Sequence, residues 1–575
     1  MNAPTVPPPA IPASLKDVVD RLMTNPDLSD TRKRDLRSAV VIYGKLKGEA
    51  LLAIPLDLAA IRHTLDGIVP AQAKVSRKRW ANLRSDLAAA LDASGLQPML
   101  KTSGIELDCA WAAILGAVKD KAVANGLSRL AHWATLREIG PAEVDDAILE
   151  WFFSDLEAAS LVRNLRGQRR SVAKSWNRLA MLAAGHALQR VQVPSNRPVS
   201  TRVPWLELPA SFRDEVEEYL VWCSVPDPLD HEARARALAP ETLRLRRDHI
   251  HLAASAACAS GIDAKHLTSL ADLVEPETFR AVLRHLWQKN GNKFSTYTRD
   301  VAVVLITIAS EWVKVPADQL SDLKKMRGKL GSLRSGLTEK NKSLLRKFDD
   351  PRLVAALLGL PDRLWRNARR NLAVSKRWFI DLETALAIDI LLHVALRIEN
   401  LAALKFDEHL HWPQGRGKPA LLVIRMEETK NESPLEFELP TALADRLYAF
   451  RNEIAPAVIG RRPDALFVSR KGKPRALRTI GLAIEKSVLR HVGVKLTCHQ
   501  FRHIAAKIHL DANPGAYETL RQLFGHKDPK TTTRFYAGID TRRAGRAHAH
   551  LVARLREARP ERVRRRPKTL QDPQE

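Results

Sequence analysis

One change of hydrophobic period constrains this chain more than any other feature. Over long stretches of its 575 residues, apolar side chains recur at spacings of three and four, the pattern of amphipathic helices. In the stretch PALLVIRMEETKNESPLEFELP, residues 419–440, LLVIRM reads as a strand, KNESP as a turn and LEFELP as a second, alternating strand. Helical spacing then returns. We therefore predict a mainly α chain, in which helical N-terminal domains precede a mixed α+β domain with a small antiparallel sheet.

Interruptions of the helical pattern predict where the domains begin and end. The segment VPSNRPVSTRVPW holds three prolines and two serines, which predicts a linker, and the segment 324–347 holds nine basic residues and one acid. We predict, in chain order, a proline-rich tail over 1–13, a helical domain over 14–192, a linker over 193–205, a second helical domain over 206–323, a basic linker over 324–347, the mixed domain over 348–545 and a basic tail over 546–575.

The charge balance indicates a polyanionic partner. The chain has 92 lysine and arginine residues against 65 acids, a formal net charge of +27. A chain this basic favours nucleic acid as its partner, although a merely solvated basic surface is the alternative that charge alone leaves open. No apolar run reaches the roughly 20 residues of a membrane span. We expect no membrane partner and no signal peptide.

Cysteine usage and nucleotide motifs narrow the chemistry further. The four cysteines are scattered and form no CxxC pair, which argues against a disulfide framework or a zinc ribbon and favours a reducing, cytoplasmic location. His499 and His503 stand four apart in HQFRH and could share a metal on one helix face. However, no glutamate follows the first histidine, and Arg502 between them would repel a cation. Because Walker and Rossmann motifs are also lacking, we predict neither a metal nor any other cofactor.

Six side chains that lie far apart in the sequence have functional groups that together suit a single reaction. They are Arg397 in ALRIENL, Lys430 in EETKNESP, His499 and Arg502 in CHQFRH, His526 in LFGHKDP and Tyr536 ten residues later. Paired arginine forks suit the charge that a phosphodiester gains in transit. A tyrosine near cations can act as a nucleophile, and a lysine can protonate a leaving oxygen. The set is what transfer of a phosphodiester to tyrosine requires.

These motifs resemble the tyrosine recombinase (phage integrase) family, strongly over about 350–545. The helices over 206–320 more loosely resemble the family's core-binding, DNA-binding domain. The resemblance implies that Arg397 and Arg502 clamp the scissile phosphate and that Lys430 is the general acid. It also implies that His499 and His526 bond the phosphate and assist proton transfer, and that Tyr536 forms a 3′-phosphotyrosine bond. Residues 14–192 exceed the family's minimal architecture.

This chain departs from the family pattern at two places. The family commonly has an acid three residues after the first arginine, where this chain has Asn400, with Glu399 one position earlier. The spacing from histidine to tyrosine is often nine, the place of Phe535, and here it is ten. Tyr536 is the only tyrosine after Tyr517, which precedes the GH motif and does not fit the pattern.

The resemblance implies a site-specific DNA recombinase that integrates or excises a mobile element. Its partner would be double-stranded DNA carrying a recombination site, on which it would act as a homo-tetramer, with partner recombinases as a further option. It would be cytoplasmic and associated with the nucleoid. Two alternatives remain open at this level. One is a type IB topoisomerase-like enzyme that reseals the same strand, and the other is an inactive DNA-binding accessory protein.

Overall fold

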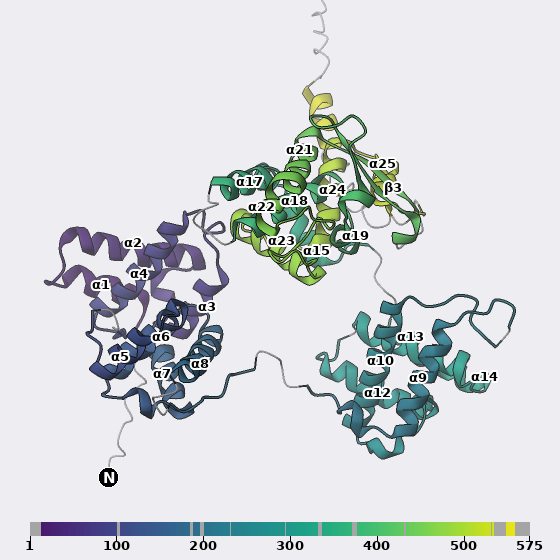
Figure 1. The fold of residues 1–575 in the computed structure, drawn as a ribbon, viewed down its shortest axis with the longest axis horizontal. Coiled ribbons are helices and arrows are strands. Elements are labelled where there is room, and N and C mark those ends of the chain that lie inside the picture. The colour runs from purple at the N-terminus through teal and green to yellow at the C-terminus, as the bar shows by residue number, and fades with distance from the viewer. Residues whose placement is uncertain are drawn as a thin grey trace, which may run out of the picture. The chain divides into compact units, whose positions relative to one another are not determined.

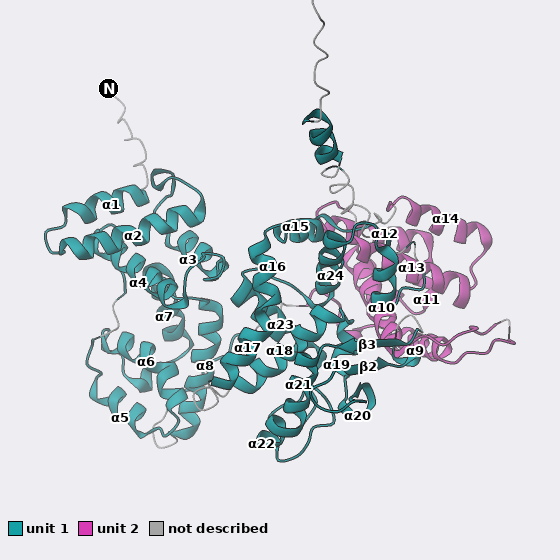
Figure 2. Ribbon diagram, turned by 90° about the horizontal axis from the view of Figure 1, so that it is seen from above, with its two compact units in different colours: residues 1–194, 336–575 teal, residues 195–335 magenta. Residues whose placement is uncertain are grey.

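The structure is a computed structural model that divides into two compact units. It describes residues 13–100, 104–183, 188–195, 200–230, 232–293, 295–331, 336–370, 377–429, 433–528, 530, 532–533, 545 and 548–557. One unit comprises residues 1–194 and 336–575, and the other comprises residues 195–335 (Figures 1 and 2). Figure 2 colours the first unit teal and the second magenta.

In its described part, the N-terminal region of the first unit contains eight α-helices with two hydrophobic cores. One core gathers around Leu15, Val40 and Leu87, and the other around Trp111, Trp133 and Trp176. Figure 1 draws these helices in purple and blue. In chain order they are α1 (Leu15–Thr24), α2 (Asp30–Lys47), α3 (Leu58–Gly67), α4 (Arg77–Ala93), α5 (Cys109–Ala117), α6 (Lys121–Thr135), α7 (Asp146–Ala159) and α8 (Leu165–Leu182).

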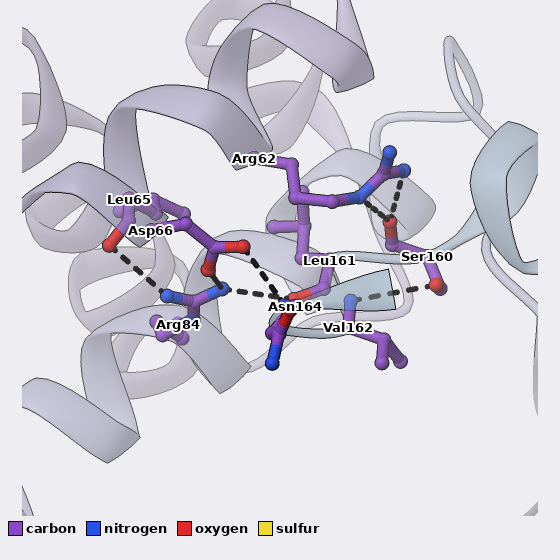
Figure 3. Close-up of polar contacts among 8 residues, drawn as sticks. All are labelled: Arg62, Leu65, Asp66, Arg84, Ser160, Leu161, Val162 and Asn164. Atoms are coloured by element: carbon purple, nitrogen blue, oxygen red, sulfur yellow. Dashed lines mark hydrogen bonds and ion pairs between the residues drawn. The ribbon is translucent and has the colours of Figure 1, made fainter. Parts of the chain in front are cut away.

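Two arginines join these two groups of helices. Arg62 of α3 is 6% exposed, and its guanidinium donates hydrogen bonds to the carbonyl oxygens of Ser160 (2.7 Å) and Glu157 (2.6 Å) at the end of α7. Arg84 of α4 donates to the carboxylate of Asp66 (3.0 Å) and to a carbonyl of the connection between α7 and α8 (Figure 3). Carbonyls at a helix C-terminus have no partner within the helix, so a buried arginine satisfies them here.

The second unit is a separate helical bundle with its own core. Its helices pack around Phe212, Tyr219 and Phe279, all fully buried. They are α9 (Ala210–Ser224), α10 (Pro240–Ala259), α11 (Leu270–Val274), α12 (Pro276–Lys289), α13 (Thr296–Thr307) and α14 (Ala317–Gly328).

The C-terminal region of the first unit combines helices with a small sheet. Its helices are α15 (Glu339–Lys347), α16 (Pro351–Leu358), α17 (Leu360–Arg370), α18 (Trp378–His393), α19 (Ile398–Ala403), α20 (Phe406–His409), α21 (Thr441–Ala449), α22 (Ala455–Ile459), α23 (Leu477–Val492), α24 (Cys498–Ala512) and α25 (Tyr517–Phe524). The strands are β1 (Leu410–His411), β2 (Ala420–Ile424) and β3 (Leu435–Leu439), in the antiparallel order β1-β2-β3 with Leu422 opposite Phe437.

The predicted fold class is confirmed: the chain is mainly α, with a small antiparallel sheet in its C-terminal region. The two strands expected within 419–440 are β2 and β3. The two-residue strand β1 was not predicted, because two residues carry no period. Within the described residues, no helix has the length and apolar character needed to cross a bilayer.

Candidate active site

Helix α24 carries the centre of the site. Its first turn is fixed by a capping box, in which the Gln500 side chain accepts hydrogen bonds from the backbone N–H (2.9 Å) and hydroxyl (3.1 Å) of Thr497. Phe501 and Ile504 pack into the core, so the helix is held on that side. Arg502 is 6% exposed on the same helix. A buried guanidinium is costly unless its donors are satisfied, so its partners decide its role.

The Arg502 guanidinium is held by two backbone carbonyls from different segments. One terminal nitrogen donates to the carbonyl of Ala395 (2.9 Å), and the other donates to the carbonyl of Phe524 (2.9 Å). The guanidinium carbon also lies 4.5 Å from the centre of the Phe524 ring. Ala395 itself has a left-handed φ of +51°, which is strained for a residue with a Cβ. The fork is therefore fixed in place before any substrate binds.

Arg397 follows directly after this strained turn. The nearly fully buried helix α18 ends at His393, and Arg397 is the N-cap residue of α19. The side chain is half-buried, and burial lowers its pKa, although an arginine stays charged at neutral pH. Within the described residues, neither a carboxylate nor a carbonyl accepts a hydrogen bond from this guanidinium. Its donors are available to an anionic substrate.

His526 is positioned by a glycine turn and by a hydroxyl. Gly525 ends α25 in the left-handed conformation (φ +59°), and a Cβ added there would stand 2.7 Å from the Leu435 side chain of β3. His526 Nε2 lies 3.4 Å from a terminal nitrogen of Arg502, which can only donate. The proton of the neutral ring is therefore on Nδ1, which donates to the Thr532 hydroxyl (2.9 Å). The turn thus aims Nε2 at the arginine.

The two imidazoles of the site lie in a positive field. Burial lowers the pKa of His526 to about 4, and the charges of Arg502 and Arg397 contribute in the same direction. His499, at the start of α24, keeps part of its surface exposed; the covering of the rest of the ring, together with the charges of Arg502 and Arg397, also lowers its pKa. Both rings are therefore neutral at neutral pH. The same field favours an anion with distributed charge, such as a phosphodiester.

Four of the six predicted site residues are brought together from segments up to 129 positions apart: Arg502 contacts His526, and the charges of Arg397 and Arg502 lower the pKa values of both His499 and His526. Lys430 and Tyr536 lie outside the described residues, so their predicted roles stay predictions. The residues on either side of 430–432 are described. The hydroxyl of Thr429 bonds the backbone carbonyl (2.9 Å) and N–H (2.9 Å) of Ser433, which ties the two sides together.

Two polar residues near this hairpin were not selected from the sequence. His409 is 4% exposed at the end of α20 and contacts the Glu428 carboxylate (3.0 Å). Asn400 is 7% exposed on α19, and its amide donates to the backbone carbonyl of Glu428 (2.8 Å). Neither contact has a sequence signal, since each joins segments 19 or 28 residues apart.

Glu408, His409 and Glu428 offer three ligand atoms within 4.8 Å of one another, the described group nearest to a metal-binding geometry. The hydrogen bonds oppose that role. The backbone N–H of Lys405 donates to His409 Nδ1 (3.0 Å), so the ring proton is on Nε2, where it faces Glu428. A metal at Nε2 would displace this proton. Glu408 is also paired with the Lys405 ammonium (2.6 Å).

Comparison with known proteins gives one sequence family and several solved structures. Residues 367–543 match the model described as the phage integrase family. No curated protein matches. A lambda integrase dimer bound to a COC′ core site shares 13% identity and a TM-score of 0.34, covering 64% of this chain and 86% of that one. The XerH recombinase bound to palindromic difH DNA after cleavage has 12% sequence identity to this chain and a TM-score of 0.34, and the match covers 60% of this chain and 99% of that one. The Tn1549 transposon integrase in complex with transposon right-end DNA has 15% sequence identity and a TM-score of 0.34, and the match covers 54% of this chain and 95% of that one.

Proposed function

The chain belongs to the phage integrase (tyrosine recombinase) family through its residues 367–543, and from that premise we propose that it is a site-specific DNA strand transferase. In this proposal it cuts and rejoins duplex DNA through a 3′-phosphotyrosine intermediate. The observation that carries the proposal is the convergence of Arg397, His499, Arg502 and His526, with the Arg502 fork held by two carbonyls. Preorganised donors of this kind stabilise charge that develops on a reacting phosphate.

The proposed reaction balances without a cofactor. The phenol of Tyr536 gives its proton to a neutral imidazole of the site, that of His499 or His526, and its oxygen forms a new bond to phosphorus. The bond from phosphorus to O5′ breaks, the electron pair stays on O5′, and Lys430 gives that oxygen a proton and becomes neutral. Arg397 and Arg502 hold the non-bridging oxygens throughout. The bond energy is kept in the phosphotyrosine, from which a 5′-hydroxyl of another strand releases the enzyme.

The distribution of charge supports duplex DNA as the partner. Residues 336–575 hold 46 lysines and arginines against 27 acids, whereas residues 195–335 hold 20 against 18. The positive excess is therefore concentrated in the part of the chain that carries the candidate site, where phosphate contacts would position the substrate. Assembly of a homo-tetramer on a recombination site, partner recombinases and action on a mobile element belong to the same proposal.

The experiment that tests the proposal is covalent capture from a random library. Purified chain is mixed with duplexes that carry a randomised segment and a nick, so that the cut strand diffuses away and the adduct persists. Adducts are isolated under denaturing conditions and the DNA is sequenced. The wild type should trap a defined set of sequences, and Tyr536→Phe should trap none.

Tyr517→Phe is the matched control, because it removes a phenol hydroxyl from another position of the same region. It should trap DNA as the wild type does. Adducts that persist in Tyr536→Phe would exclude this residue as the nucleophile. A wild type that binds DNA but traps no sequence from the library would contradict the strand-transferase function itself.

A further inference from the structure

The segment 461–478, which joins α22 to α23 and includes the first residues of α23, is strongly basic. Its sequence RRPDALFVSRKGKPRALR holds seven lysines and arginines and a single acid, Asp464. Six of the cations are exposed: Arg461, Arg462, Arg470, Lys471, Lys473 and Arg478. Within the described part of the chain, no carboxylate forms an ion pair with any of these six. Cations that are not offset by nearby acids favour a polyanionic partner.

The middle of the segment, residues 467–475, folds into a tight turn, here called the basic hairpin. The backbone N–H of Ser469 donates to the carbonyl of Lys473 (2.7 Å), and the N–H of Lys473 donates to the hydroxyl of Ser469 (3.2 Å). Gly472 closes the turn in the left-handed conformation (φ +73°), and its N–H donates to the carbonyl of Ser469 (2.8 Å). The backbone of the tip is therefore fixed, and its exposed cations extend from it into solvent.

A buried carboxylate holds the basic hairpin against α18. Glu383 is 3% exposed, and its two oxygens accept hydrogen bonds from the backbone N–H of Val468 (2.6 Å) and from Nε of Arg475 (2.6 Å). Hydrogen bonds to a charged carboxylate are strong, and one carboxylate here fixes both sides of the hairpin. Arg475 is the seventh cation of the segment, and this ion pair removes its charge from the exposed set. The basic hairpin is thus a rigid part of the C-terminal region.

The helices that hold the basic hairpin also carry Arg397 of the candidate active site. The backbone N–H of Leu466 donates to the carbonyl of Leu404 (2.9 Å), the residue that follows α19. Glu383 lies ten residues before the end of α18 at His393. At 1.5 Å per residue this is about 15 Å along the helix axis. The hairpin is therefore anchored at about that distance along the helix that leads to Arg397.

The tip of the basic hairpin suits a phosphate backbone better than a protein surface. The core of a protein–protein interface usually contains apolar and aromatic side chains. Phe467 and Val468 are each 2% exposed, so they pack inside the molecule, and the tip at 469–473 exposes no apolar side chain. Phosphate binding needs only accessible cations. Among polyanions, duplex DNA is the one that the candidate active site of the same region would also hold.

We propose that the basic hairpin and the exposed cations beside it bind the phosphate backbone of the DNA duplex that reacts at the candidate active site. The inference rests on the proposed function for the identity of the polyanion, and it adds a surface that the six predicted site residues do not include. Each strand of a duplex carries one phosphate per about 3.4 Å of its axis, so about 15 Å corresponds to about four or five base steps. The contacted phosphates lie about that far from the cut. Such contacts give affinity and register without reading the bases.

The test measures DNA affinity against salt concentration for the full chain. The triple variant combines Arg470→Ala, Lys471→Ala and Lys473→Ala, and the duplexes are one of random sequence and one recovered by the covalent capture. Each lost phosphate contact lowers the slope of log affinity against log salt by about 0.9, so the triple variant should lose about 2.7. We expect the same loss on both duplexes, because phosphates are common to all sequences.

A second triple variant is the matched control, because it removes three cations that are already paired with acids. They are Lys342, Arg416 and Lys495, which pair with Glu339, Glu453 and Glu485 at 2.8, 3.1 and 3.1 Å. Their replacement by alanine removes the same formal charge from the same region of the chain. The salt slope should stay near that of the wild type. Equal losses in the two triple variants would mean that net charge, and not the basic hairpin, sets the affinity, and would overturn the inference.

A second measurement locates the contacts along the DNA. Neutral methylphosphonates replace the phosphates of a captured duplex one at a time. Wild-type binding should weaken at phosphates about four or five base steps from the cut, as the strand spacing requires. At these positions the triple variant should lose no further affinity, because the contact that the neutral group removes is already absent. Additive losses at every phosphate would contradict the proposed contact.

The outcomes separate this inference from the function on which it rests. A triple variant with the wild-type salt slope would overturn the inference, while adducts of the wild type would still support the proposed function. Normal DNA binding with poor joining of two duplexes would assign the surface to contacts between copies of the chain, which also overturns it. If the triple variant does not fold, as judged by circular dichroism, Arg462→Ala with Arg478→Ala decides the question, with an expected loss of about 1.8 in slope. A wild type that binds duplex DNA but traps no adduct would contradict the proposed function instead.

Discussion

Two buried arginines in this chain make the same kind of hydrogen bond in different surroundings. Arg62 in the N-terminal region and Arg502 in the C-terminal region are each 6% exposed, and each donates to backbone carbonyls of segments remote in sequence. Beside Arg62, the nearby Arg84 is paired with Asp66, so positive charge is offset. Around Arg502 the second positive charge is that of Arg397, and the two charges together lower the pKa values of His499 and His526, opposed at His499 only by the smaller effect of Glu399.

This difference shows how a buried arginine with a structural role can be told from one that acts in a reaction. Satisfied donors alone are what any buried guanidinium needs, so they are consistent with a purely structural role. A gathering of like charges costs folding free energy, and chains keep such strain mainly where substrate binding uses it. We therefore expect substitution of Arg62 to affect stability and substitution of Arg502 to affect catalysis.

The largest expected effect is that of Arg502→Lys on adduct formation. Lysine keeps the charge but cannot donate to two carbonyls and a phosphate as a planar fork does. Loss of one such preorganised donor costs about 10²–10³ in rate, and we expect a fall of that size. The rate is measured with a captured nicked duplex, and Arg366→Lys, on an exposed arginine of α17, should react as the wild type does. A fall of less than tenfold would show that the fork is dispensable.

The second effect is that of Arg62→Met on the stability of the N-terminal region. The substitution leaves the carbonyls of Glu157 and Ser160 without their charged donor, which costs about 2–3 kcal/mol. Amide hydrogen exchange should accelerate over α7 and the start of α8, while adduct formation stays unchanged. Arg34→Met, on an exposed arginine of α2, should leave the exchange as it is. Slower adduct formation in Arg62→Met with normal exchange would remove the contrast between the two arginines.

The sequence predicted the features whose signals lie in neighbouring residues, and it did not predict contacts between distant segments. The change of period at 419–440 predicted β2 and β3, because the signal depends on neighbouring residues. The motifs also named Arg397, His499, Arg502 and His526, which the structure brings together. The carbonyls that hold Arg502 and the hydrogen bonds from Asn400 and His409 to Glu428 depend on which segments meet, and no hydrophobic period carries that information.

The third effect is that of Gly525→Ala on the turn that aims His526. A residue with a Cβ pays about 1–2 kcal/mol for the left-handed conformation, and here the new methyl would also meet Leu435. Gly415→Ala is the matched control, since Gly415 also has a positive φ (+79°) but no neighbour within 4 Å of an added Cβ. Denaturant unfolding should find Gly525→Ala the more destabilised. Equal destabilisation would mean that contact with β3 does not hold the turn.

The smallest effect is a shift in the pKa of His526, which measures the influence of the neighbouring arginine charges. The ring has a pKa of about 4 in the folded chain and about 6.5 when unfolded, so the unfolded chain binds more protons between those values. The stability that the neutral ring contributes is present above about pH 6.5 and is lost as the pH falls toward 4. Arg502→Gln removes one positive neighbour and should raise the pKa of His526 by on the order of one unit, which narrows that window. Nuclear magnetic resonance of the ring protons measures the shift, with the remote Arg366→Gln as control. An unmoved His526 would mean that burial alone sets its pKa, and the electrostatic distinction between Arg62 and Arg502 would then fail.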